Sequence, residues 1–579
     1  MPGTTPTQSA STGPAGSPSG SQSASQPSSQ LTVLVVDPNP GMRANLQNML
    51  AASGIHRIEF AVNAGGAVKA LARKGYDIVL CEYSLGSSND SSGGAGQDGQ
   101  QLLEDLRHHK LIAPWTIFIM LTAEGARDRV LGAAELAPTD YILKPFTPQV
   151  LNERIGRALA RRAALLPAWQ QAAQGDARAA IATCIAAAKS APRYAVDFAR
   201  LRAELHLALG ESAHAEAVYR QVLAARPLGW ARLGLARTLL DRQRADDALA
   251  LLTALVADNP RLMAAYDLLA RCHAARGEHA QARKALEEAV AISPHMVRRL
   301  RRLGRAALDD GDMPAAEKAF RQVVTRSRHS TFRNPEDHVD LVRALVGKGD
   351  VAAAGAVVRD LERSLRGSPE TTACRAIAGA MLHEAAGETA AAAAALRQAV
   401  DAVRGGGKLS GAMRVGLARA CLAQQLDEEA SALMLAALHG NAADDDDDDD
   451  RAALSARQAE DLFVQAGRPD LADGMHRQLR AQARILLGLA DEKRNMGDVR
   501  GAVQTLLEAL RLAPTDLQVT LALVGGILRQ VMEMGWDDAL AALAAEQLAQ
   551  LRALDATHPR LQALEAELAA ARRKYGIGV

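Results

Sequence analysis

Two kinds of hydrophobic pattern divide the chain. From residue 31 to about residue 162, short apolar runs alternate with stretches in which apolar residues recur at helical spacing. The runs read as strands because they are short, rich in β-branched residues and bounded by polar or turn residues. They are LTVLVVD (31–37), HRIEFAV (56–62), YDIVLCE (76–82), WTIFIMLTA (115–123) and DYILKP (140–145). Five strands alternating with helices, RDRVLGAAELA (127–137) among them, predict an α/β flavodoxin-like domain with a five-stranded parallel sheet.

Beyond about residue 163 the strand pattern stops and a repeat begins. Prolines fall at Pro192, Pro227, Pro260 and Pro294, at intervals of 35, 33 and 34 residues. Glycines recur in phase with them, at Gly175, Gly210, Gly277 and Gly311, with Gln243 in the missing slot. A small residue follows five positions later, at Ala180, Ala215, Ala248, Ala282 and Ala316. A period of about 34 residues is that of tetratricopeptide (TPR) helix-turn-helix units, so an all-α TPR solenoid is predicted.

The same pattern continues towards the end of the chain. It recurs at Gly497, Ala502 and Pro514, with longer units around Gly349 and Gly387 and a degenerate one around Leu426. In such units glycine ends one helix, the small residue lets the pair approach closely, and proline stops the second helix. We expect the small and apolar positions to be packing residues, and any binding to use the concave surface that stacking creates.

These patterns give a division of the chain into five segments. They are a disordered Ser/Pro/Gly-rich tail (1–30), the α/β domain (31–162), a TPR array (163–442), an acidic disordered loop (443–450) and further TPR-like and capping helices (451–579). A loop rich in serine and glycine (87–98) interrupts the α/β domain after the third strand. The last helix of that domain is expected to run into the first repeat through residues 155–174.

Composition narrows the class of protein. The 579 residues carry a net charge of +1, with both signs spread along the chain, which argues against a nucleic-acid footprint. The N-terminus lacks the pattern of a secretory signal, and no stretch of about 20 apolar residues predicts a membrane span. Five isolated cysteines predict buried thiols in a reducing compartment, so a cytoplasmic protein is expected. Since no nucleophile elbow, P-loop or metal motif is found, we expect no enzyme and no cofactor.

Candidate chemistry gathers at one edge of the predicted sheet. Functional residues of doubly wound sheets collect at the carboxyl ends of the strands. Those ends here carry Asp37, Glu82, Thr122 and Lys144. Two acids, a hydroxyl and an amine are therefore expected to converge.

At these residues the α/β domain resembles the receiver domain of bacterial two-component response regulators. The resemblance covers roughly residues 31–160 and rests on VLVVD (33–37), LCEYSLG (80–86), FIMLTAE (118–124) and YILKPF (141–146). GQQLLEDLR (99–107) is similar to a stretch in the group in which a receiver precedes TPR repeats. The resemblance implies an acceptor acid after the third strand, two acids that help hold Mg²⁺, and a hydroxyl and a lysine that sense the phosphoryl group.

Matched one by one, several residues agree with that family. Asp37 corresponds to the first metal-binding acid, Thr122 and Lys144 to the phosphoryl-sensing pair, and Tyr141 to the aromatic switch position. Pro145 matches a proline that follows a cis peptide bond in the family.

Two positions depart from the family pattern. The second metal-binding acid is replaced by Pro38, and the acceptor position holds Glu82 in place of aspartate. The extra methylene moves the carboxylate by roughly 1.5 Å, and misplacement of that order can cost about 100-fold in rate. Mg²⁺ demands oxygen ligands in near-octahedral geometry, so a weak remnant of the metal site at Asp37 is expected.

The sequence leaves three interpretations of Glu82 open. In the first, Glu82 is a fixed charge paired with Lys144 in a pseudo-receiver. In the second, it is a relic that keeps the fold satisfied while the domain merely docks partners. In the third, Glu82 or another acid is still phosphorylated. The first predicts a non-enzymatic signalling adaptor of a phosphorelay pathway whose TPR array binds protein partners. The alternatives are a working response regulator with TPR output and a constitutive structural scaffold. A histidine kinase or another response regulator is a candidate partner of the signalling adaptor and of the working response regulator.

Overall fold

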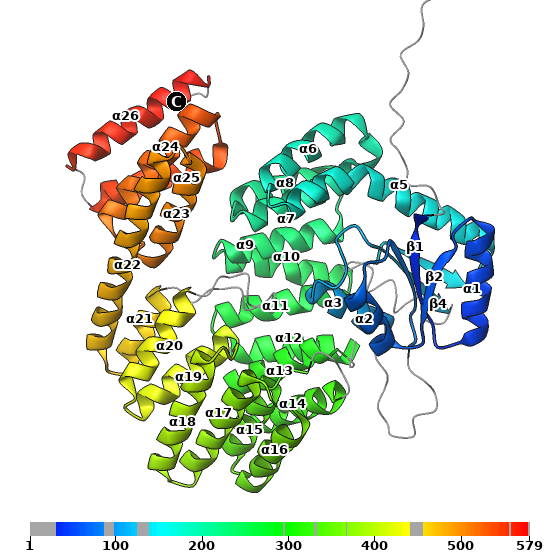
Figure 1. Ribbon diagram of the computed structural model, residues 1–579, viewed down its shortest axis with the longest axis horizontal. Helices are drawn as coiled ribbons and strands as arrows, with labels where there is room; N and C mark the ends of the chain where they lie inside the picture. Colours follow the sequence, from blue (N-terminus) through cyan, green and yellow to red (C-terminus); the bar gives the residue numbers. More distant parts are fainter. Residues whose placement is uncertain are drawn as a thin grey trace, which may run out of the picture. The chain divides into compact units, whose positions relative to one another are not determined.

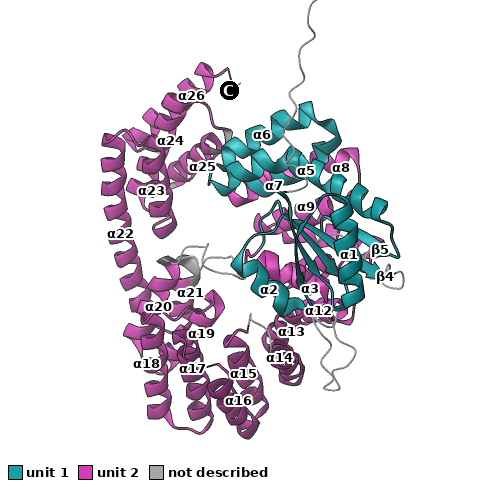
Figure 2. Ribbon diagram, turned by 45° about the vertical axis from the view of Figure 1, so that its right-hand side comes forward, with its two compact units in different colours: residues 1–85, 112–127, 137–205 teal, residues 86–111, 128–136, 206–579 magenta. Residues whose placement is uncertain are grey.

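The computed structural model describes residues 30–85, 98–123, 138–292, 296–328, 333–365, 367–439, 456–554 and 557–576. The chain forms two compact units, coloured separately in Figure 2. The first contains residues 1–85, 112–127 and 137–205, and the second contains residues 86–111, 128–136 and 206–579.

The first unit is built on a five-stranded parallel sheet (Figure 1). Its strands are β1 (Thr32–Val36), β2 (Arg57–Ala61), β3 (Ile78–Glu82), β4 (Ile117–Ala123) and β5 (Asp140–Lys144). The strand order is β2-β1-β3-β4-β5, with every neighbouring pair parallel. This confirms the flavodoxin-like prediction, and each strand lies within the apolar run that predicted it.

Three helices of this unit follow the sheet strands. They are α1 (Pro40–Ala52), α2 (Ala64–Arg73) and α5 (Pro148–Ala173). Apolar residues of β1, β3 and β4 form one core with residues of α1 and α5, including Leu50 and Leu151, both fully buried. α3 (Gly99–His108) begins at a capping box formed by Asp98 and Gln101, and is counted with the second unit.

One helix, α5, takes part in two cores. Its first half contributes Leu151 and Ile155 to the core of the sheet. Its second half contributes Leu165 and Ala168 to a core shared with the first repeat helices. The expectation that the last helix of the α/β domain runs on into the repeats is therefore confirmed.

From residue 177 onward the described chain is helical. The helices, in order, are α6 (Ala177–Ser190), α7 (Ala195–Ala208), α8 (Ser212–Ala225), α9 (Gly229–Asp241), α10 (Ala245–Asp258), α11 (Met263–Ala275), α12 (His279–Ile292), α13 (Val297–Asp309), α14 (Met313–Ser327), α15 (Glu336–Lys348), α16 (Val351–Ser364), α17 (Pro369–Ala385), α18 (Thr389–Arg404), α19 (Gly411–Ala423), α20 (Asp427–His439), α21 (Ala456–Gln465), α22 (Pro469–Asn495), α23 (Val499–Leu512), α24 (Leu517–Met534), α25 (Asp538–Leu554) and α26 (Pro559–Lys574), with a short 3-10 turn at Pro192–Tyr194. This confirms the predicted all-α repeat region.

The repeat signature has the local structure that the sequence predicted. The residues at the small position, Ala180, Ala215, Ala248, Ala282 and Ala316, are all buried. Pro227, Pro260 and Pro514 lie two residues after the ends of α8, α10 and α23. The glycines of the turns have positive φ, a conformation that costs L-residues roughly 1–2 kcal/mol.

Some predicted features fall outside the described residues. They are the tail 1–29, most of the loop 87–98, the helix expected at 127–137, the proline at 294 and the acidic run 443–450. The five cysteines are all free and buried, as expected. Within the described ranges, every helix is too short or too polar to cross a membrane.

The turn at Gln243 provides a test of the repeat geometry. Gln243 occupies the glycine slot with a φ of 62°, whereas Gly277 in the next unit has a φ of 74°. Gln243→Gly is expected to stabilise the protein by about 1 kcal/mol because it removes the left-handed penalty. Gly277→Gln is the matched control and should destabilise by a similar amount. Thermal unfolding followed by circular dichroism measures both, and shifts of the same sign would contradict this account.

Candidate functional site

The carboxyl ends of three strands bring charged side chains together. Asp37 directly follows β1, Glu82 ends β3 and Lys144 ends β5. β1 is hydrogen-bonded to β3, while β4 pairs Leu121 with Glu82 and Ala123 with Lys144. The parallel register therefore places the acids and the amine at one edge of the sheet, as the sequence predicted.

Lys144 is shared by the two carboxylates. Its Nζ lies 3.1 Å from Asp37 Oδ2 and also donates a hydrogen bond to Glu82 Oε2. The side chains of Asp37, Glu82 and Lys144 are only 2%, 13% and 19% exposed. Because water reaches the group poorly, its charges are screened less than those of a surface pair. One ammonium thus compensates two acids, which leaves a formal charge of −1 on the three side chains.

The remaining carboxylate oxygens also have donors. The backbone N–H of Asn39 donates to Asp37 Oδ1 at 2.8 Å. The backbone N–H of Ser84 donates to Glu82 Oε1 at 3.2 Å. All four oxygens of the two acids therefore accept a hydrogen bond from the protein itself.

Arg43 adds a second cation that sequence reasoning missed. Its Nη1 donates to the carbonyl oxygens of Asp37 (2.6 Å) and Pro38 (3.0 Å). Arg43 lies in the first turns of α1, where a basic residue is ordinarily a solvent-facing helix residue, so its position gave no signal. The guanidinium group stands beside the place where the family pattern has a second acid.

The other family-matched residues lie on β4, on β5 and directly after β5. Thr122 is fully buried, and its Oγ1 donates to the carbonyl of Ala123 at 3.4 Å, which is a long bond. Tyr141 is half-buried on β5. The Lys144–Pro145 peptide bond is cis, as the resemblance implied.

Comparisons with known proteins agree with this architecture. Residues 33–156 match the family model of the response regulator receiver domain, and residues 233–297 and 377–448 match a tetratricopeptide repeat model. The chain joins a receiver domain to TPR repeats. This combination fits a signalling protein with a protein-interaction region.

Individual relatives cover only part of the chain. Chemotaxis protein CheY of Pseudomonas aeruginosa is 28% identical over 131 residues, which are 23% of this chain and 98% of that protein. Chemotaxis protein CheY-3 of Vibrio cholerae is 26% identical over 131 residues, 23% of this chain and 93% of the relative. Among solved structures, PilW, a type IV pilus biogenesis factor, is 21% identical with a TM-score of 0.30 and covers 35% of this chain and 93% of its own. A response regulator receiver domain protein from Clostridium thermocellum is 20% identical with a TM-score of 0.20, covering 23% of this chain and 96% of its own.

In the repeat region, buried charge gathers at the start of α15. We call Glu336, Asp337 and Asp340 the α15 acid cluster; all three are buried. Arg301 of α13 forms a bidentate pair with Asp337, at 2.5 and 2.9 Å.

The rest of the α15 acid cluster is paired as well. Asp340 meets Arg305 at 3.4 Å and Arg343 at 3.2 Å. Glu336 accepts two hydrogen bonds of 2.6 Å from the backbone N–H and the hydroxyl of Ser410, the N-cap of α19. The cluster therefore ties α15 to α13 on one side and to the start of α19 on the other.

Burial perturbs the acids of this cluster. Burial raises the pKa of Glu336, although the hydrogen bonds from Ser410 oppose it. Burial likewise raises the pKa of Asp340, against the lowering effect of Arg305 and Arg343. Sequence reasoning missed the cluster because acids in the first turn of a helix, such as Glu336 and Asp337, usually interact with the helix dipole at the surface.

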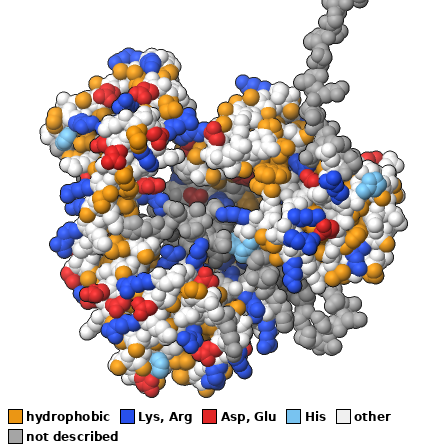
Figure 3. Space-filling view, viewed as in Figure 1, with side chains coloured by type: hydrophobic (Ala, Val, Ile, Leu, Met, Phe, Trp, Pro, Cys, Tyr) orange, Lys and Arg blue, Asp and Glu red, His pale blue; other side chains and the backbone are white. Residues whose placement is uncertain are grey.

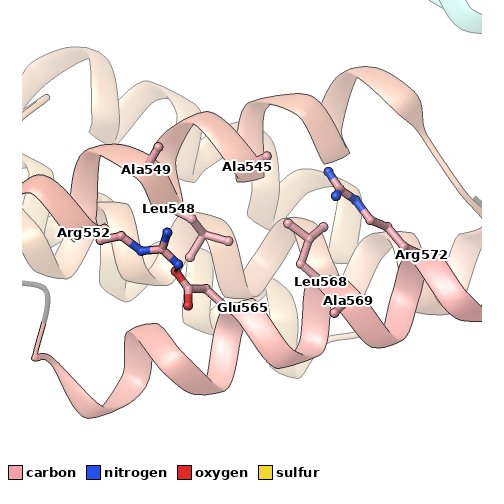
Figure 4. A pocket seen from close by; sticks show the side chains of 8 residues that line it. All are labelled: Ala545, Leu548, Ala549, Arg552, Glu565, Leu568, Ala569 and Arg572. Atoms are coloured by element: carbon pink, nitrogen blue, oxygen red, sulfur yellow. Dashed lines mark hydrogen bonds and ion pairs between the residues drawn. The ribbon is translucent and has the colours of Figure 1, made fainter. Parts of the chain in front are cut away.

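The last helix pair carries a shallow groove. It has a volume of about 340 Å³ and lies between α25 and α26. Its walls are mostly small and apolar, and one rim is an ion pair between Arg552 and Glu565 at 2.6 Å (Figure 4). The groove is lined by Ala545, Leu548, Ala549, Arg552, Glu565, Leu568, Ala569 and Arg572.

Replacing Lys144 tests its bridging role. Lys144→Met removes the cation and leaves Asp37 and Glu82 close together, so the sheet edge should lose on the order of 3–5 kcal/mol of local stability. Hydrogen exchange of the full chain, read by mass spectrometry, should then be faster in peptides from β1 and β3, and unchanged in α24. Adding Glu82→Gln should recover part of the loss. Unchanged exchange in Lys144→Met would contradict the bridge.

Removing Glu336 tests the α15 acid cluster. Glu336→Ala breaks both hydrogen bonds to Ser410 and should lower the free energy of unfolding by about 1–3 kcal/mol. The matched control is Glu533→Ala, which removes an exposed partner of Arg529 on α24 and should change it by less than about 0.5 kcal/mol. Equal effects of the two variants in urea unfolding would contradict a structural role for the cluster.

The raised pKa of Glu336 also gives a pH dependence of known sign. In the window above the ordinary value of 4.5, the folded state keeps a proton on Glu336 that the unfolded state has released. The contribution of Glu336 to stability therefore falls as pH rises through that window. Glu336→Gln does not titrate, so the stability of the wild type relative to this variant should decline with rising pH.

Proposed function

We propose that the protein is a non-enzymatic signalling adaptor of a two-component pathway. Its receiver domain is a pseudo-receiver held in one state, and its TPR array binds protein partners. The observation that carries the proposal is the closed group of Asp37, Glu82 and Lys144. The protein's own donors already satisfy every carboxylate oxygen of that group.

Acceptance of a phosphoryl group would require this arrangement to open. An acceptor carboxylate needs an oxygen placed in line with the phosphorus atom. Glu82 Oε2 is held by Lys144 and Oε1 by the backbone of Ser84. The side chain is also one methylene longer than aspartate, which misplaces its carboxylate for transfer.

The residues at this edge make a poor ligand set for Mg²⁺. Pro38 offers no carboxylate, and the Arg43 guanidinium donates to the carbonyl oxygens of Asp37 and Pro38. Both oxygens of Asp37 already accept hydrogen bonds. Because Mg²⁺ requires several oxygen ligands in octahedral geometry, the set does not fit the ion, and the proposed function uses none.

The negative charge of Glu82 is the feature that we propose sets the signalling state of the pseudo-receiver. A phosphorylated aspartate carries about −1.5 to −2 charges near neutral pH, whereas Glu82 places a single permanent charge farther from the strand. Its ion pair with Lys144 is the contact through which that charge acts on β5. We propose that this fixed pair partly mimics the signalling state.

Protein partners are assigned to the repeats. TPR repeats commonly mediate protein–protein interaction. On the face shown in Figure 3, Lys and Arg side chains are interspersed with Asp and Glu, which supports a protein rather than a nucleic acid as partner. A histidine kinase or another response regulator in the cytoplasm is the partner class that we propose.

A working response regulator is the second candidate function. It is favoured by the retained Asp37, Thr122 and Lys144 at the positions that the family uses. In that case Glu82 or a neighbouring acid would accept the phosphoryl group, and the repeats would transmit the change.

Phosphorylation with a small donor separates the two functions. The full chain is incubated with labelled acetyl phosphate and Mg²⁺, alongside Glu82→Asp and Glu82→Ala. The pseudo-receiver predicts that the wild type acquires no stable label. Its rate of phosphorylation should be at least about 100-fold below that of a competent receiver run in parallel. Stable label on the wild type that disappears in Glu82→Ala would establish the working regulator instead.

A further inference from the structure

A histidine–glutamate pair recurs at the turns of the repeats. His206 Nδ1 lies 2.7 Å from Glu211 Oε2, His273 Nδ1 lies 2.6 Å from Glu278 Oε2, and His383 Nδ1 lies 2.7 Å from Glu388 Oε2. In each turn the backbone N–H of the glutamate also donates to the carbonyl of the histidine, at 2.8 to 2.9 Å. The three turns therefore have the same structure, and the histidine–glutamate pair by itself is a structural contact that closes the turn.

The first of these turns carries an additional histidine. His214, in the first turn of α8, stacks on His206 with ring centroids 5.2 Å apart and an interplanar angle of 18°. One ligand-capable atom from each of His206, Glu211 and His214 lies within 4.8 Å of the other two. The equivalent position in the other turns holds Gln281 or Ala391, neither of which is a metal-binding residue type.

The first pair is also the least exposed of the three. The side chains of His206 and Glu211 are 12% and 9% exposed, against 42% and 58% for His383 and Glu388. A site with restricted access to water holds its ligands in fewer orientations and lowers the cost of ordering them. Local sequence and burial thus single out the same turn.

We propose that His206, Glu211 and His214 form a binding site for a divalent transition-metal ion such as Zn²⁺. Two imidazoles and one carboxylate are a ligand set that zinc uses when it keeps a coordination position for water or another group. Imidazole ligands favour Zn²⁺, Ni²⁺ or Cu²⁺ over Mg²⁺ or Ca²⁺, which prefer oxygen. The ion would join the end of α7 to the start of α8 and strengthen the turn that the hydrogen-bonded pair already closes.

Zinc binding to the full chain tests the site. The protein is stripped with a chelator, dialysed against Zn²⁺ and analysed for bound metal, while its thermal unfolding is followed with and without Zn²⁺. The wild type is expected to hold one Zn²⁺ more than His214→Gln, and only the wild type should unfold at a higher temperature when Zn²⁺ is present. Glu211→Gln removes one of the three ligands and should weaken binding by more than the roughly 10- to 100-fold that is typical of groups that only support a ligand.

The equivalent turn of another repeat provides both a substitution that the fold tolerates and a matched control variant. His214→Gln installs the residue that the equivalent turn holds as Gln281, so the substitution is compatible with the repeat fold. His273→Gln removes a histidine from that equivalent turn and should leave the zinc content unchanged. Equal zinc in the wild type and His214→Gln, or an equal loss in His273→Gln, would overturn the proposal.

Discussion

The Lys144 ammonium lies between two carboxylates that would otherwise repel each other at the edge of the sheet. The register of the parallel strands fixes this arrangement, because it brings Asp37, Glu82 and Lys144 to one edge. Two acids buried side by side need a cation, and Lys144 is shared between them. The proposed pseudo-receiver rests on that sharing, since opening the site would require Lys144 to leave one of the two acids.

The α5 helix gives this edge a physical link to the first repeat. It starts a few residues after Lys144 and packs on the sheet through Leu151 and Ile155. The same helix then packs on the first repeat helices through Leu165 and Ala168. The sheet and the first repeat helices are therefore joined by one continuous helix.

Much of this structure could be predicted because its signals are local. Alternation of short apolar runs and amphipathic helices gave the parallel sheet, and the phase of Gly210, Ala215 and Pro227 gave the turn, the close contact and the helix end of a repeat. The converging strand ends gave Asp37, Glu82 and Lys144. Even the exception at Gln243 followed the phase of the repeat, since its backbone adopts the left-handed turn that the slot requires.

What escaped prediction depends on contacts between distant residues. The hydrogen bonds of Arg43 to the carbonyls of Asp37 and Pro38 have no sequence signature, because any exposed helix residue could be arginine. The tie between Glu336 and Ser410 joins positions 74 residues apart, and only the folded array brings them together. The sequence does not distinguish His206 and His214 from other repeat residues, because they stack only when the turn between α7 and α8 has formed.

Manganese binding at the sheet edge tests the closed site most directly. Mn²⁺ binds the oxygen ligands that Mg²⁺ prefers and is observed by electron paramagnetic resonance. The full chain and its Asp37→Asn variant are titrated with Mn²⁺ side by side. A closed edge predicts the same amount of bound Mn²⁺ in both proteins, whereas a saturable site in the wild type that disappears in Asp37→Asn would contradict it.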